Sequence, residues 1–263
     1  MLIDFHTHCF PEKLAERAIG SLSYASGGLF NNTDGTVTGL KEKMAADGVD
    51  ASVVLNIATN AHQMPKVNDF AAAINDGKSI FSFGSVFPDA PDALDELDRI
   101  KALGLKGVKL HPDYQGFSVD DPKMIPIYKK ISSLGLITVF HAGVDIGFPP
   151  PYGCTPDKSC GILKYFDTPV VLAHLGGIGC YEQVIDLLCG QNVYLDTAFC
   201  YAMLPKCKAL EIFEKHGCDK ILFGTDIPWQ TAPMTMRFLN TLGLTDTDMD
   251  NITHKNAMKL LKI

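Results

Sequence analysis

Eight short apolar runs alternate with amphipathic stretches along the chain, and this alternation restricts the possible folds more than any other feature. Most of the runs are rich in β-branched residues and end near glycine or proline, which is typical of strands buried on both faces. Strands buried in this way belong to parallel sheets whose connections are helical. The predicted strands span residues 2–8, 51–58, 80–88, 105–112, 136–143, 169–177, 192–199 and 220–229.

The stretches between the strands have the 3.6-residue periodicity of amphipathic helices. Eight strands that alternate with helices favour a closed (β/α)₈ TIM barrel over an open sheet. The 263 residues fit one such domain over residues 1–263, because a barrel typically needs about 250 residues, and we expect no β-sandwich subdomain. Thr245 is the predicted N-cap of the last helix. The predicted helices span residues 40–48, 67–75, 92–104, 121–135, 181–190, 206–217, 235–243 and 244–261.

Two connections are too long for ordinary turns. Residues 20–38 are rich in glycine, serine and asparagine, and residues 143–160 contain three consecutive prolines. Both follow predicted strands, so we expect them to be loops at the same rim of the barrel, where such connections form active sites.

Composition excludes several classes of protein. The net charge of -7 and the absence of a cluster of basic residues argue against nucleic-acid binding. No apolar stretch approaches the roughly 20 residues of a membrane span, and the N-terminus lacks the pattern of a signal peptide. The eight cysteines form no CxxC pair, as expected of reduced thiols. We therefore expect a cytoplasmic protein that acts on a small molecule without a nucleic-acid or membrane partner. The sequence leaves open whether the chain forms a homo-oligomer.

Histidines gather at the predicted strand ends. Five of the eight histidines lie there, and Asp226 follows the eighth strand. The carboxyl ends of the strands are where TIM barrels carry their chemistry, so the clustering indicates a site rather than chance. The five histidines are His6, His8, His111, His141 and His174.

Neutral imidazoles and a carboxylate are the ligands that a divalent cation such as Zn²⁺ prefers. His6 and His8 are two residues apart on one strand and so share a face. Together with His141 and Asp226 they can form a metal site with an open position, where bound water becomes a hydroxide near neutral pH. One Zn²⁺ is therefore the expected cofactor; Mn²⁺, Co²⁺ and Fe²⁺ also fit such ligands.

The remaining candidates surround this predicted metal site. His174 is the expected catalytic histidine, which polarises the substrate or moves a proton, with Asp226 as its catalytic partner; as an alternative, His174 binds a second ion. Lys109 is either a bridging ligand after carboxylation or, by the preferred interpretation, a rim or salt-bridged lysine that contacts substrate. His111 and Tyr114 are further candidates for substrate binding. Asp196 either orients a ligand or caps the segment that follows it.

Four motifs carry a resemblance to a known family: DFHTH at residue 4, FHAG at 140, LAHLGG at 172 and LFGTDIPW at 222. With these motifs the chain resembles the amidohydrolase superfamily, and more narrowly its branch containing aminocarboxymuconate semialdehyde decarboxylase and related hydrolases and hydratases. The resemblance implies a distorted barrel, a metal held by His6, His8, His141 and Asp226, and His174 as the catalytic histidine.

The expected activity is metal-dependent hydrolysis of a small ester, lactone or amide by a metal-bound hydroxide. The alternative is non-oxidative decarboxylation or hydration of an unsaturated keto-acid at the same site. The decarboxylases of the branch hold substrate carboxylates with arginines, and the strand-end motifs of this chain contain none, unless Arg17 reaches in from the first long connection. A non-catalytic, metal-binding barrel is the third hypothesis, although it has no need of Asp226 as a proton acceptor.

Overall fold

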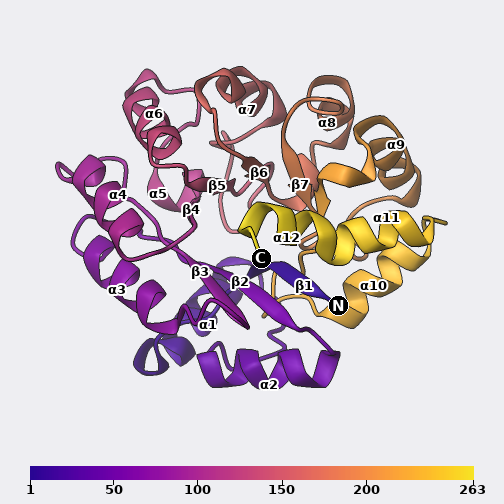
Figure 1. Ribbon diagram of the computed structural model, residues 1–263, viewed down its shortest axis with the longest axis horizontal. Coiled ribbons are helices and arrows are strands. Elements are labelled where there is room, and N and C mark those ends of the chain that lie inside the picture. The colour runs from indigo at the N-terminus through magenta and orange to yellow at the C-terminus, as the bar shows by residue number, and fades with distance from the viewer.

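The computed structural model describes residues 1–263 and forms a closed barrel of parallel strands surrounded by helices (Figure 1). All eight predicted strands are present in the predicted order, and each is shorter than the sequence pattern indicated. The strands are β1 (Ile3–Thr7), β2 (Ala51–Leu55), β3 (Ile80–Phe83), β4 (Gly107–Leu110), β5 (Ile137–Phe140), β6 (Val170–Leu172), β7 (Tyr194–Asp196) and β8 (Ile221–Leu222).

Two sets of regularly paired strands, β1–β3 and β4–β8, meet at two seams that close the barrel. At the first seam Gly84 pairs with Val108, so that a single bridge joins β3 to β4. At the second seam Phe5 donates its N–H to the carbonyl of Phe223, and Thr7 pairs with Ile227. This second seam places the segment after β8 directly beside β1.

Twelve α-helices surround the strands. Several end at a glycine with positive φ, for example α2 at Gly48 (φ 71°), where the absence of Cβ removes the steric cost of that conformation. No helix combines the length and the apolar character that a membrane span requires. The helices are α1 (Glu12–Ala25), α2 (Val37–Asp47), α3 (Met64–Ile74), α4 (Ala93–Ala102), α5 (Pro112–Gln115), α6 (Ile125–Ser133), α7 (Pro156–Ile162), α8 (Tyr181–Leu187), α9 (Lys206–His216), α10 (Ala232–Asn240), α11 (Asp246–Asp250) and α12 (Asn256–Leu261).

The apolar side chains form two main layers. Inward-pointing residues of the strands, among them Phe5, Val53 and Val139, fill the barrel together with Leu260 and Leu261 of α12. The larger cluster lies between the outer faces of the strands and the helices. Helix α12 crosses the strands near the middle of the molecule in Figure 1. Its apolar side chains close the end of the barrel opposite the polar strand ends.

The two long connections are only partly loops. Residues 20–38 were expected to be irregular, but α1 extends to Ala25 and α2 begins at Val37. The sequence pattern did not predict helix α1, because only Ala15 and Ile19 are buried and its second half contains glycine and serine. Helix α7 likewise forms inside the second connection. In both cases burial against the barrel overrides a weak local preference.

The predicted N-cap of the last helical segment is confirmed. Thr245 Oγ1 accepts a hydrogen bond from the Asp248 N–H (3.2 Å), and Asp248 Oδ2 accepts one from the Thr245 N–H (3.1 Å). We expect Thr245→Ala to lower the free energy of unfolding by about 1 kcal/mol, because orphan N–H groups lose their acceptor. Urea denaturation measures this loss. Thr247→Ala is the exposed control, and an equal loss in both variants would contradict the role of the cap.

Candidate metal centre

All the predicted site residues line one cavity of about 800 Å³ at the carboxyl ends of the strands. Each lies on a strand or within four residues of its end, because the parallel barrel brings all of these ends to one rim. The residues are His6, His8, Lys109, His111, Tyr114, His141, His174 and Asp226.

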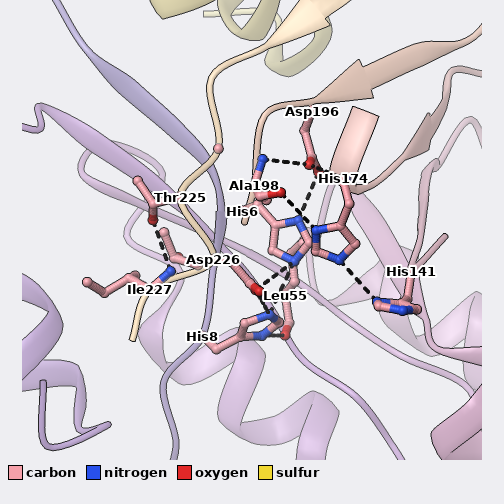
Figure 2. Close-up of polar contacts among 12 residues, drawn as sticks. His6, His8, Leu55, His141, His174, Asp196, Ala198, Thr225, Asp226 and Ile227 are labelled. Carbon is pink, nitrogen blue, oxygen red and sulfur yellow. Dashed lines mark hydrogen bonds and ion pairs between the residues drawn. The ribbon is translucent and has the colours of Figure 1, made fainter. Parts of the chain in front are cut away.

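Three of these side chains converge on a common point at the floor of the cavity (Figure 2). His6 Nε2 and His8 Nε2 lie 3.2 Å apart. Asp226 Oδ1 lies 3.3 Å from His6 Nε2 and 3.1 Å from His8 Nε2. Asp226 reaches this point because its N–H donates to the His6 carbonyl at 2.9 Å across the second seam of the barrel.

Hydrogen bonds on the far side of each ring determine which nitrogen carries the proton. His6 Nδ1 lies 2.8 Å from Asp196 Oδ2, and His8 Nδ1 lies 2.9 Å from the Leu55 carbonyl. Both partners are acceptors, so each Nδ1 donates and each Nε2 of a neutral ring keeps its lone pair. Two nitrogen lone pairs and a carboxylate oxygen therefore face one another, which is repulsive unless a cation lies between them.

The donor set fits a divalent metal. Zn–N bonds of about 2.0–2.1 Å at tetrahedral angles place neighbouring ligand atoms about 3.3 Å apart, close to the separations found here. Burial, with a further contribution from Lys109, lowers the pKa of His6 well below its usual value and keeps the ring neutral. Burial acts to raise the pKa of Asp226, but the close imidazoles of His8, His6 and His174 hold it below its ordinary range. Neutral imidazoles and an ionised carboxylate are the protonation states that metal binding needs.

His141 lies outside this group of three. Its Nδ1 is 3.1 Å from His174 Nε2, and its Nε2 has no hydrogen-bond partner and lies 3.9 Å from Asp145 Oδ2. Its ring stacks on His111 with centroids 4.1 Å apart, and His111 Nε2 contacts the same Asp145 oxygen at 3.2 Å. Ligation of the metal by His141 stays a prediction.

Asp145 was missed by sequence reasoning, and the only local signal is its position four residues after His141. It contacts His111 and lines the cavity. Burial lowers the pKa of His111 to about 4 despite the hydrogen bond to Asp145.

Lys109 occupies the floor of the cavity rather than its rim. Its side chain is 1% exposed, its Nζ lies 3.5 Å from His6 Nε2, and no carboxylate oxygen lies within 4.0 Å of it. The interpretation as a rim or salt-bridged lysine is therefore wrong: the direction of β4 points Nζ into the barrel, where no acidic side chain lies within ion-pair distance of it. Burial lowers the pKa of Lys109 to about 8, which leaves the amine mostly cationic at pH 7.

Of the other candidates, Tyr114 packs its ring edge against His111 with centroids 4.5 Å apart. His174 donates from Nδ1 to the Ala198 carbonyl at 2.9 Å, so its Nε2 faces His141. His174 (φ 57°) and Asp226 (φ 68°) both have left-handed backbone conformations, which cost energy in residues with a Cβ and cluster at functional sites.

Asp196 orients the histidines from behind. Its Oδ1 accepts hydrogen bonds from the His174 and Ala198 N–H groups at 2.9 and 3.1 Å, and its Oδ2 accepts from His6 Nδ1. Both roles considered for this residue have a contact: Oδ2 orients His6, and Oδ1 caps the following segment at the Ala198 N–H. The carboxylate also holds the strained backbone of His174 in place, and Figure 2 shows it bridging the two histidines.

We expect Asp196→Asn to weaken binding of the metal by about 10- to 100-fold, because an amide no longer fixes the His6 proton on Nδ1. Competition with a chromophoric chelator measures the affinity. Asp186→Asn, an exposed change on α8, is the matched control. Unchanged affinity in Asp196→Asn would show that the orienting hydrogen bond is dispensable.

The comparisons with known proteins agree with this architecture. The amidohydrolase family model matches residues 3–263. A search of curated protein sequences gave no significant match.

Several solved structures share the fold. A dihydroxybenzoic acid decarboxylase of Polaromonas with bound manganese is 15% identical (TM-score 0.75, 99% of this chain and 96% of that one). The 5-carboxyvanillate decarboxylase of Sphingomonas paucimobilis is 16% identical (TM-score 0.73, 100% and 99%). A probable 2-pyrone-4,6-dicarboxylic acid hydrolase of Acinetobacter baumannii is 17% identical (TM-score 0.67, 100% and 99%). The match over nearly the whole sequence, on a barrel whose strand ends carry the candidate metal ligands, shows that this chain is a metal-dependent enzyme of the amidohydrolase family.

Proposed function

We propose that the protein is a metal-dependent, non-oxidative decarboxylase of an organic acid. The observation that carries the proposal is the convergence of His6, His8 and Asp226 beside the buried ammonium of Lys109. The cationic Lys109 has no carboxylate within ion-pair distance in the protein, so a carboxylate of the substrate can contact it directly. The structurally similar decarboxylases support decarboxylation in preference to the hydrolysis that the sequence favoured.

His6, His8 and Asp226 would hold the cation, with His141 as a further predicted ligand. When bound, a divalent cation would polarise a substrate oxygen and stabilise the negative charge that develops on it. Zn²⁺ is the proposed ion because two of the ligands are imidazoles. Mn²⁺ is the second choice, because the similar decarboxylase from Polaromonas contains bound manganese. Co²⁺ and Fe²⁺ fit the same ligands.

The side chains of the cavity have distinct roles in the proposed reaction. Lys109 binds the reacting carboxylate by charge. His174 keeps its Nδ1 proton on the Ala198 carbonyl, which leaves Nε2 as the atom that accepts or donates a proton. Asp226 is the second proton-handling group, and Tyr114 and His111 contact the body of the substrate from the cavity wall.

Hydrolysis of a lactone, ester or amide is the second candidate, and the probable hydrolase from Acinetobacter baumannii on the same fold favours it. In that reaction His174 and Asp226 move the proton from the attacking water to the leaving group. The two reactions differ in whether carbon dioxide is released.

The test uses protein loaded separately with Zn²⁺, Mn²⁺, Co²⁺ or Fe²⁺. Three probe substrates are 2,6-dihydroxybenzoate, 5-carboxyvanillate and 2-pyrone-4,6-dicarboxylate, with carbon dioxide and ring-opened products measured together. Metal-dependent carbon dioxide release from either benzoate, lost in His6→Ala/His8→Ala, supports the decarboxylase. Ring opening without carbon dioxide favours the hydrolase, and no turnover by any metal form would contradict both.

A further inference from the structure

The outer part of the cavity is a groove between helices α1 and α3. Helix α1 lines it with side chains spaced three and four residues apart, which is one face of a helix. These are Leu14, Arg17, Ala18, Ser21 and Leu22. The neighbouring face of α1 carries Ala15 and Ile19, which are buried in the protein. Helix α1 therefore presents a second, distinct face to the cavity.

Helix α3 lines the cavity in the same way. The residues that face it are Gln63, Lys66, Val67 and Phe70, again with helical spacing. Each helix thus contributes one cation, Arg17 or Lys66, among apolar and uncharged neighbours. The space lined by these two helix faces is called the α1–α3 groove from here on.

Neither cation has a carboxylate partner in the protein. Arg17 makes no side-chain hydrogen bond or ion pair, and the only polar contact of Lys66 Nζ is His62 Nε2 at 3.2 Å. The acidic residue nearest to Lys66 on α3, Asp69, lies 2.7 Å from Arg99 and does not line the cavity. In α1, Glu12 and Glu16 also lie off the cavity-lining face.

The charges of the cavity are separated along its length. Its carboxylates, Asp145 and Asp226, lie at the floor with the histidines, whereas Arg17 and Lys66 lie on the outer helices. Apolar side chains, among them Phe10, Leu55 and Trp229, also line the cavity, and 16 of its 34 lining residues are hydrophobic. A volume of about 800 Å³ is in the upper part of the range of about 300–1,000 Å³ for pockets that hold drug-sized ligands. The cavity therefore has room for more than a single-ring acid.

We propose that the α1–α3 groove binds a second anionic group of the substrate through Arg17 and Lys66. The substrate class is an extended organic acid whose reacting group lies at the metal centre and whose apolar body joins it to a distal carboxylate or other anion. A guanidinium and an ammonium that line one cavity attract such an anion, because neither has a carboxylate partner in the protein that neutralises it. The assignment of the reacting end rests on the proposed function.

The test measures binding rather than turnover, so that it does not depend on the reaction. The probes are 8-anilinonaphthalene-1-sulfonate and N-phenyl-1-naphthylamine, which share one ring system and differ by the sulfonate. Both are titrated by fluorescence against the full-length, metal-loaded protein, and again after chelation to exclude contact with the metal. We expect the anionic probe to bind more tightly than the neutral one and to weaken as salt is added.

In Arg17→Gln/Lys66→Gln the anionic probe should bind about tenfold more weakly, and the neutral probe should bind as before. Lys13→Gln/Lys78→Gln removes the same charge from exposed positions outside the cavity and is the matched control. Thermal melting checks that both variants are folded. Equal binding of the anionic probe by wild type and Arg17→Gln/Lys66→Gln, or equal losses in both double variants, would overturn the proposal. Because no turnover is measured, either result leaves the proposed decarboxylation to be judged by its own assay.

Discussion

Asp226→Asn is expected to lower kcat on any accepted substrate by about a thousandfold or more, the scale seen when a central catalytic group is removed. The asparagine keeps the size of the side chain but loses both the negative charge and the ability to accept a proton. Its amide can also donate hydrogen bonds to His6 Nε2 and His8 Nε2, the atoms that face Asp226 Oδ1 at 3.3 and 3.1 Å. The variant would thus satisfy with hydrogen bonds the lone pairs that otherwise need a cation.

Steady-state kinetics on the best substrate of the panel measure this loss, with metal content determined on the same samples. Asp95→Asn, an exposed change on α4, provides the control for general effects of the substitution. A variant at residue 226 that retained wild-type kcat with full metal would remove Asp226 from the machinery proposed here.

His6→Ala/His8→Ala is expected to lose the metal completely on desalting, because it removes two of the three converging ligand atoms. The same variant should no longer gain thermal stability when metal is added. In the wild type added metal should raise Tm, since a ligand that binds only the folded state stabilises it by mass action. Without metal, the Tm of the variant should fall below that of the metal-free wild type by no more than the loss of two imidazole side chains explains. The reason is that the variant also loses the repulsion between the Nε2 lone pairs.

Elemental analysis and melting curves with and without added Zn²⁺ measure both effects. His62→Ala/His254→Ala is the matched control, because it removes two other histidines. Neither belongs to the group of His6, His8 and Asp226 or to the second candidate group, which is His111, His141 and Asp145. Full metal content in His6→Ala/His8→Ala would place the metal elsewhere, with the group of His111, His141 and Asp145 as the remaining candidate.

The barrel was predictable from the sequence because its strands are local features. Runs such as 51–58 and 136–143 are mostly apolar, and burial on both faces favours that composition wherever the strand lies in the barrel. The strand ends, and with them the candidate residues, follow from the same pattern. Helix α1 was not predictable in this way: glycine and serine in its second half weaken the local signal, and packing of Ala15 and Ile19 supplies the stability that the segment lacks alone.

The details of the candidate site depended on contacts between distant parts of the chain. His6 and Asp196 are 190 residues apart, and their hydrogen bond determines which nitrogen of His6 faces the metal position. His174 and His141, 33 residues apart, contact each other, and His141 lies outside the group of His6, His8 and Asp226. The side-chain direction along one strand follows from its own alternation, but partners across the barrel depend on the rotation and register of every strand.

The amino-acid sequence by itself determined that eight strands would close into a barrel and that five histidines, Lys109 and Asp226 would meet at one end of it. Those conclusions need only the two-residue alternation of a strand and the common direction of parallel strands. Only the tertiary structure decided which three ligand atoms converge, that Asp145 joins His111 and His141, and that Arg17 and Lys66 face one groove. Distances of 3 Å between side chains are set by how helices and strands far apart in the sequence pack together, and no local pattern specifies that packing.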